Sequence, residues 1–216
     1  MAATKKVPRK RRPQERAEVT KRTLITVALK EFSERGYDAV TVRDIETLAG
    51  VQRNLVRYHF GSKEELWKAA AGFNIEQLQK FTERRGEMMR DIESKHGRIS
   101  YIIRSFVRFC AKHPELNSLL LEEGTQDSWR IEWLVQNHVK RAMLGLRELV
   151  KSDLGLSDEE FINWYYIMIG GGAMIFSVAP EAKLMFGTDT KSSKVVDRHA
   201  DMLTAMLMMK MQAPPN

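Results

Sequence analysis

The chain lacks the residues on which most catalytic, metal-binding and secreted proteins depend. Among 216 residues it has one cysteine, Cys110, so no disulfide can form within the chain and a reducing compartment fits. The apolar pattern around Cys110 favours a buried structural thiol over a redox sensor. Its five histidines are scattered singly, without Cys/His metal spacing, a glycine-rich phosphate loop or a nucleophile motif. The sequence therefore predicts a protein that is not an enzyme, with no cofactor and no metal.

Strand and targeting patterns are missing as well. The chain shows no alternating strand pattern, no tandem repeat and no coiled-coil heptads, and its apolar residues instead recur at helical spacing. Residues 1–13 are basic and polar and no apolar segment follows them, so we expect no signal peptide. Together these features predict an all-α fold and a cytoplasmic location.

One stretch, 161–179, is apolar enough to be considered as a membrane span, because it approaches the ~20-residue length that such a span needs. However, three consecutive glycines, 170–172, stand in its middle, acidic residues precede it, and the rest of the chain is highly charged. A helix that is apolar all round is equally suited to a soluble core or to an oligomer interface. We therefore expect no membrane association.

Residues 40–63 carry the clearest functional pattern, which predicts two short helices joined by a glycine turn and followed at once by a third. Thr41 and Asp44 have the spacing of a capping box at the start of the first helix. Gly50 stands where that helix must end, and a second helix is expected from about 52 to 60. Such a unit can place one helix in a DNA major groove.

The second of these helices combines an apolar side with polar side chains that can reach DNA. Its outward residues can hydrogen-bond base edges or phosphates, and they are Gln52, Arg53, Asn54 and Arg57. Ser62 and Glu65 then form a second capping box that opens the next helix. Lys63 lies in the first turn of that helix, where a cation opposes the helix dipole. We therefore expect Lys63 to contact something outside the helix, such as a phosphate.

The stretch from about Lys21 to Ala71 resembles the N-terminal DNA-binding domain of the TetR/AcrR transcriptional regulators. The residues that carry the resemblance keep the family's order and spacing, and they are Ala28, Phe32, Gly36, Tyr37, Thr41, Val42, Ile45, Ala49, Gly50, Val51, Tyr58, His59, Phe60, Ser62, Lys63, Glu65 and Leu66. The resemblance implies a three-helix, helix-turn-helix DNA-binding domain, followed by a larger helical domain that binds an effector and dimerises.

The resemblance also implies roles for individual residues. An arginine at the place of Arg43 often contacts DNA, and Tyr58 and His59 match a pair that lies near the phosphates. Helix packing is the alternative role of that pair, and the two roles can coexist. Leu55 and Arg57 depart from the family pattern, so the operator sequence cannot be carried over. The expected DNA contacts are Thr41, Arg43, Gln52, Arg53, Asn54, Arg57, Tyr58, His59 and Lys63.

The net charge of +7 is concentrated near the N-terminus, just before the helix-turn-helix segment 40–63. Residues 1–22 hold nine Lys/Arg and two Glu, whereas the charges of the remaining residues cancel. This density, together with Pro8 and Pro13, predicts a disordered arm over 1–13. A solubilising tail is the alternative, but the position of the arm favours phosphate or minor-groove contacts. The arm residues expected at DNA are Arg9, Arg11 and Arg12.

The chain also has a helical pattern after the helix-turn-helix segment 40–63. The predicted helices cover about 62–95, 98–112, 127–153, 161–179 and 194–209, with a short helix between Pro114 and Gly124. The predicted domains are a disordered basic arm (1–13), the helix-turn-helix domain (14–61), a helical ligand-binding and dimerisation domain (62–210) and a disordered tail (211–216). Two phrases, 109–117 and 176–183, loosely resemble a branch of TetR-type effector domains.

An effector site is expected within residues 98–180, because aromatic residues there accompany isolated polar groups, as in mostly apolar ligand pockets. Filling the core is the alternative role of each residue. The ligand-site candidates are Arg104, Phe106, Trp129, Trp133, His138, Trp164 and Tyr165. The expected effector is a small, mainly apolar molecule of aromatic or lipid-like character.

A single reading unit per chain predicts a homodimer on a near-palindromic double-stranded DNA operator. We expect the helices 127–153 and 161–179 to pair with their symmetry mates in a four-helix interface. The interface candidates are Ile169, Gly172, Ala173 and Phe176. The sequence thus predicts a dimeric transcriptional regulator, a repressor that the effector releases from its operator. The alternative is a helical DNA-binding or architectural protein that needs no effector.

Overall fold

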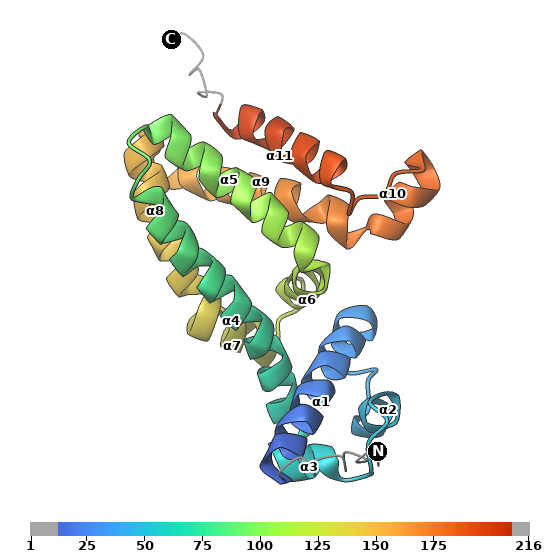
Figure 1. Ribbon diagram of the computed structural model, residues 1–216. Helices are drawn as coiled ribbons and strands as arrows, with labels where there is room; N and C mark the ends of the chain where they lie inside the picture. Colours follow the sequence, from blue (N-terminus) through green and yellow to red (C-terminus); the bar gives the residue numbers. More distant parts are fainter. Residues whose placement is uncertain (1–12, 209–216) are drawn as a thin grey trace, which may run out of the picture. The chain divides into compact units, whose positions relative to one another are not determined.

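Helices alone make up the secondary structure of the computed structural model, which describes residues 13–208 (Figure 1). No strand occurs within that range, so the predicted all-α class is confirmed. The chain divides into two units, unit 1 up to Phe73 and unit 2 from Asn74 onward. The division falls inside one helix, α4, whereas the sequence led us to expect a domain boundary at residue 61.

Unit 1 contains the short helices that the sequence predicts. Its elements are α1 (Pro13–Arg35), α2 (Val42–Leu48), α3 (Leu55–Phe60) and the first part of α4 (Lys63–Met89). All of them supply side chains that are fully buried, among them Leu24 and Phe32 of α1, Ile45 of α2, Val56 of α3, and Leu66 and Trp67 of α4. Leu48, an apolar residue of α2, is 57% exposed.

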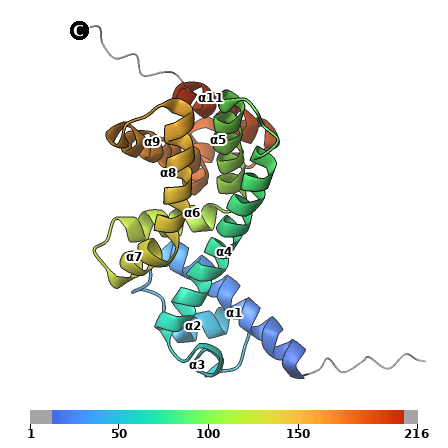
Figure 2. The same cartoon turned by 90° about the vertical axis from the view of Figure 1, so that its left-hand side faces the viewer.

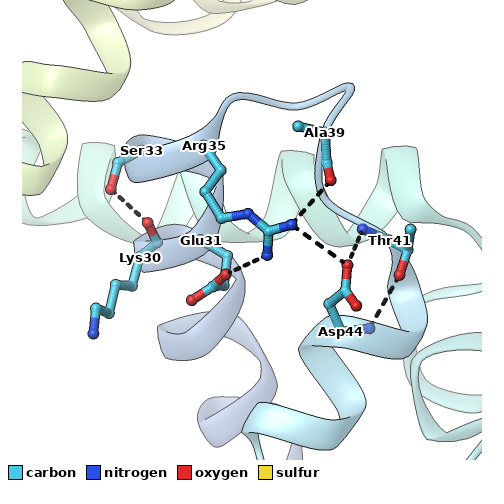
Figure 3. Close-up of polar contacts among 7 residues, drawn as sticks. All are labelled: Lys30, Glu31, Ser33, Arg35, Ala39, Thr41 and Asp44. Atoms are coloured by element: carbon cyan, nitrogen blue, oxygen red, sulfur yellow. Dashed lines mark hydrogen bonds and ion pairs between the residues drawn. The ribbon is translucent and has the colours of Figure 1, made fainter.

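Arg35 ties the end of α1 to the beginning of α2 (Figure 3). Its guanidinium donates to Glu31 Oε2 at 3.0 Å and to the Ala39 carbonyl at 3.3 Å, and it lies 3.8 Å from the Asp44 carboxylate. Asp44 closes the predicted capping box by accepting the Thr41 N–H at 3.0 Å and donating its own N–H to Thr41 Oγ1 at 3.1 Å. The hydrogen bonds to Thr41, reinforced by the charge of Arg35, hold the pKa of Asp44 below its usual range.

Unit 2 is a helical assembly in which α5 packs against both α9 and α11 (Figures 1 and 2). Its further elements are α5 (Lys95–Lys112), α6 (Pro114–Gly124), α7 (Trp129–Leu134), η1 (Val135–Val139), α8 (Lys140–Leu154), α9 (Asp158–Ser177), α10 (Ala179–Phe186) and α11 (Ser193–Met208). The predicted helix over 127–153 is interrupted by η1, a π-helical turn. Helix α10 was not predicted, because the apolar run conceals the end of α9 at Ser177.

Helix α9 is the apolar stretch that raised the membrane question. Within residues 13–208 no single helix is long and apolar enough to cross a membrane. Only α9 and α10 taken together pass that test, and they are bent by 69° at their junction. Trp164 of α9 donates its indole N–H to the Leu207 carbonyl at 3.3 Å, which ties α9 to α11.

The glycines of α9 allow its neighbours to approach closely. A Cβ placed on Gly172 would lie 2.8 Å from an atom of the Phe106 ring of α5, and one on Gly171 would lie 2.9 Å from a Leu203 methyl of α11. Separations below 3.0 Å require a neighbouring group to move. These glycines therefore let α5 and α11 pack directly on the α9 backbone.

We predict that Gly172→Ala lowers the free energy of unfolding by about 1–3 kcal/mol, because the added methyl overpacks against the rigid Phe106 ring. Gly145→Ala is the matched control, since Gly145 lies exposed in α8 and a Cβ added there would meet no atom within 4 Å. It should raise stability by about 0.5–1 kcal/mol through helix propensity. Urea unfolding followed by circular dichroism at equal protein concentrations measures both. Stabilisation by both substitutions would contradict the close contact.

Candidate functional site

The turn between α2 and α3 has the geometry that the sequence predicts. Gly50 adopts a left-handed φ of +65°, and the N–H of Val51 donates to the Glu46 carbonyl at 3.1 Å. The Gly50 N–H donates to the Thr47 carbonyl at 3.1 Å, so the Glu46 and Thr47 carbonyls at the end of α2 both accept hydrogen bonds. A glycine is required here because the left-handed conformation is strained for other L residues.

Helix α3 begins later than expected, at Leu55 instead of about residue 52. Asn54 precedes it with a left-handed φ of 69° and makes no side-chain capping hydrogen bond. The cap comes instead from α2, because Glu46 Oε1 accepts the N–H of Val56 at 2.9 Å. Glu46 is only 5% exposed, so this carboxylate is a buried cap that holds α3 to α2. Sequence reasoning missed it because no local pattern links residues ten positions apart.

Most of the predicted DNA contacts are exposed on this unit. The exposed ones are Thr41, Arg43, Gln52, Arg53, Asn54, Arg57 and Tyr58. Tyr58 is 78% exposed, so it contributes little to helix packing. The His59 ring is half-buried and lies edge-on to Tyr58, with ring centroids 4.9 Å apart. Because α3 begins at Leu55, Gln52, Arg53 and Asn54 lie before this helix, whereas Arg57 and Tyr58 lie on it.

Lys63, in the first turn of α4, is placed by an aromatic group. Its Nζ lies 4.2 Å from the centroid of the Tyr37 ring, and Tyr37 in turn meets Trp67 edge-on at 6.4 Å. A hollow of about 250 Å³ is lined in part by Arg57 and Lys63, together with Asn54. The two cations make this hollow suited to an anionic oxygen group such as a phosphate.

The predicted contacts in the basic arm, Arg9, Arg11 and Arg12, lie outside the described residues. They remain predictions. Within the described part of the chain, no group of three or more His, Cys, Asp or Glu side chains is placed to hold a metal ion.

Among the ligand-site candidates, Trp133 and His138 come together, with ring centroids 4.8 Å apart in an edge-on arrangement. Both ring nitrogens of His138 are shielded from solvent and have no hydrogen-bond partner within residues 13–208. Burial lowers the pKa of His138, so the imidazole is neutral at pH 7. His138 belongs to η1, and single π-helical turns are frequent at functional sites.

The other candidates are spread over unit 2 and are occupied in structural contacts. Arg104 pairs with Asp201 beside an open groove of about 430 Å³ between α5 and α11, and Tyr165 packs against Phe161 at 6.0 Å. Trp129 lies near the Arg130 guanidinium, 5.9 Å from ring centroid to carbon. Phe106 and Trp164 make the contacts with Gly172 and Leu207 described above. The structure therefore does not bring all of the candidates to one site.

The dimer candidates on α9 face the interior of unit 2 more than its surface. Gly172 is buried, Phe176 is 3% exposed, and Ile169 and Ala173 pack partly against the core. Other apolar residues of α9 and α11 are exposed, namely Ile162, Tyr166, Ile167, Met174, Met202 and Met206. We call this set the exposed apolar stripe.

Comparison with known proteins finds similarity to DNA-binding regulators over the segment that contains α2 and α3. The family model described as "Bacterial regulatory proteins, tetR family" matches residues 24–70. The HTH-type transcriptional regulator TtgR of Pseudomonas putida is 41% identical over 59 residues, 27% of this chain and 28% of that protein. The HTH-type transcriptional repressor NicS of another Pseudomonas putida strain is 24% identical over 111 residues, 51% of this chain and 50% of that protein. The chain thus matches half or less of the length of these relatives.

The likeness to solved structures extends further along the chain. The transcriptional regulator FadR from Bacillus subtilis, whose crystal structure is a complex with stearoyl-CoA, matches with a TM-score of 0.64. The match covers 88% of this chain and 99% of that chain, at 14% sequence identity. At such low identity the similarity shows the shared fold, which includes both helical units.

We predict that Glu46→Ala destabilises unit 1 by about 1–3 kcal/mol, because it leaves the buried Val56 N–H without an acceptor. Glu46→Gln keeps an Oε1 acceptor and should retain most of the stability. Glu34→Ala, at an exposed position of α1, is the control for losing a glutamate. Amide hydrogen exchange at Val56 is the direct measurement. Protection of this amide in Glu46→Ala equal to that of the parent would show that Glu46 is not the cap.

Proposed function

We propose that this chain, which belongs to the TetR family of bacterial regulatory proteins, binds an operator as a homodimer and represses transcription until a small apolar effector releases it. The proposal rests chiefly on one observation. The capped turn between α2 and α3 leaves hydrogen-bonding and cationic side chains exposed together, those of Gln52, Arg53, Asn54, Arg57 and Tyr58.

This arrangement suits the reading of a duplex. Glu46 and Gly50 hold α3 against α2, so the exposed side chains stand on a rigid support. The Arg57 guanidinium can donate to two acceptors on the edge of one base. The Gln52 amide can pair with one donor and one acceptor on a base edge. Lys63, beside the hollow, supplies a phosphate contact that positions the unit without reading sequence.

Dimerisation is supported by the exposed apolar stripe on α9 and α11. Tyr166 is 68% exposed and Met202 is 67% exposed, and both stand on helices that form the core of unit 2. A C2 interface uses the same surface on both copies, so two helices per chain suffice for a four-helix contact. We therefore assign the interface to α9 and α11, in place of 127–153 and the buried side of 161–179.

The effector is supported by the unsatisfied imidazole of His138. A buried polar group without a partner is unfavourable unless a ligand or water satisfies it. His138 lies against Trp133, so this pair offers a ligand an aromatic surface and one hydrogen-bonding group. The complex of the structurally similar FadR with stearoyl-CoA, and the repressor name of NicS, agree with a ligand-responsive repressor. A saturable effect of a small molecule on operator affinity distinguishes this function from an effector-independent architectural role.

We predict that Gln52→Ala and Arg57→Ala each remove about 1–3 kcal/mol of discrimination between an operator selected from random duplexes and scrambled DNA. Lys63→Ala should weaken binding to all sequences alike and reduce the log–log salt slope by about 0.9. Arg141→Ala, at an exposed position of α8, is the control for losing a positive charge. Mobility-shift titrations at several salt concentrations provide these values. Equal affinity of the parent protein for operator and scrambled DNA would overturn the proposed function.

We predict that Tyr166→Glu dissociates the dimer, because it buries a charge in the apolar interface. Leu121→Glu is the control, since Leu121 is 54% exposed on α6 and lies outside the exposed apolar stripe. Sedimentation velocity measures the oligomeric state of both variants. A Tyr166→Glu variant that remains a stable dimer would place the interface elsewhere.

A further inference from the structure

Arg85 of α4 is a buried cation without a counterion. Its side chain belongs to a residue that is only 9% exposed, and its Nε is shielded from solvent. Within residues 13–208 this Nε has no hydrogen-bond partner, and no ion pair of Arg85 with a carboxylate occurs among them. Burial lowers the pKa of Arg85 to about 10, so the group still carries its charge at neutral pH. Sequence reasoning did not single out Arg85, because nothing in α4 distinguishes it from the exposed Arg84.

Two partly buried arginines of unit 2, Arg130 and Arg98, are paired with carboxylates. Nε of Arg130 donates to both carboxylate oxygens of Glu123, at 2.8 and 2.9 Å. Arg98 makes a bidentate pair with Asp153, at 2.6 and 2.7 Å. Buried charges in proteins are normally paired, because desolvation of a single ion is strongly unfavourable. Arg85 has no such carboxylate partner within residues 13–208, so an anionic ligand can supply one.

The surroundings of Arg85 are aromatic. The guanidinium carbon lies 5.6 Å from the centroid of the Phe81 ring, one turn earlier on α4. Phe81 in turn packs against Phe109 of α5, with ring centroids 4.8 Å apart. Tyr101 of α5 raises the pKa of Arg85, against the larger effect of burial. The Arg85 guanidinium therefore lies beside an apolar row, which Phe81 of α4 and Phe109 of α5 form.

We propose that Arg85 anchors an acidic head group of the effector, which is an apolar acid. The carboxylate or phosphate oxygens of the ligand pair with the guanidinium, and its apolar part lies along the partly exposed Phe81. Guanidinium groups bind such oxygens through two parallel hydrogen bonds, which fixes the orientation of the ligand. The inference rests on the proposed function and specifies the class of its effector.

The head group sets the selectivity that the experiment measures. A neutral analogue of equal length leaves Arg85 unpaired, so it should bind at least about tenfold more weakly than the acid. Pairs of probes separate this effect from apolar contact alone, namely dodecanoate with dodecanol and phenylbutyrate with phenylbutanol. Dodecyl phosphate, compared with dodecanoate, shows which of the two anionic groups the site takes. Binding to the full-length protein is measured by isothermal titration calorimetry at neutral pH.

Variants at position 85 identify the residue responsible. Arg85→Met removes the charge and keeps most of the volume, so the acid and its alcohol should bind with equal affinity. Arg85→Lys keeps a charge but not the planar fork, and it should retain a reduced preference for the acid. Arg84→Met, at the exposed neighbouring position, should keep the full preference. Thermal unfolding without ligand is the second measurement, and Arg85→Met should unfold at the same or a higher temperature than the parent.

The outcomes separate this inference from the proposed function. Equal binding of acid and alcohol by the parent protein, or no binding of any acidic probe, overturns the anchor. A lower unfolding temperature of Arg85→Met also overturns it, because the guanidinium would then stabilise the empty fold. An acid preference that depends on Arg85, without any change in operator affinity, confirms the anchor and refutes the effector part of the proposed function. If a neutral molecule releases the protein from the operator, the proposed function stands, and the inference that the effector is an acid is wrong.

Discussion

The one covalent connection between the two units is helix α4, and every account of regulation in this chain depends on it. The helix is unbroken from Lys63 to Met89, and the division between the units falls within it. Its first turn carries Lys63, a proposed phosphate contact, and its later turns carry Arg85, the proposed ligand anchor. On the proposed function, ligand and DNA would therefore contact the same helix, at its two ends.

Polar groups that are buried in this fold divide into two kinds, and the division separates stability from function. The Glu46 carboxylate and the Arg98–Asp153 pair have complete partners, and each holds one element to another. Arg85 and His138 have buried polar atoms without a partner within residues 13–208. Satisfied groups rigidify a core, whereas unsatisfied ones are unfavourable until a ligand arrives. On the proposed function, a ligand would supply the partners that these two side chains lack.

The sequence predicted those features whose cause is local. The capping box at Thr41 and the left-handed Gly50 depend on residues within three or four positions, and the structure contains both. The start of α3 could not be predicted in the same way, because its cap comes from Glu46 on another helix. The direction in which α9 faces was also undetermined, since a stretch that is apolar all round has no polar side to mark the surface. Only the packing of α5 and α11 shows which side of α9 is left exposed.

Release of DNA requires more than a tight ligand, because a molecule that binds two conformations equally shifts nothing between them. The Arg85 charge offers a source of such a difference. An ion pair is sensitive to the position of its partner, and a bidentate one tolerates little displacement of the guanidinium plane. If an acid binds as proposed, it would favour the position of α4 in which its head group reaches Arg85 while its apolar part contacts Phe81. Reciprocity then demands that operator binding, if it prefers another position, weakens the affinity for the acid by the same factor.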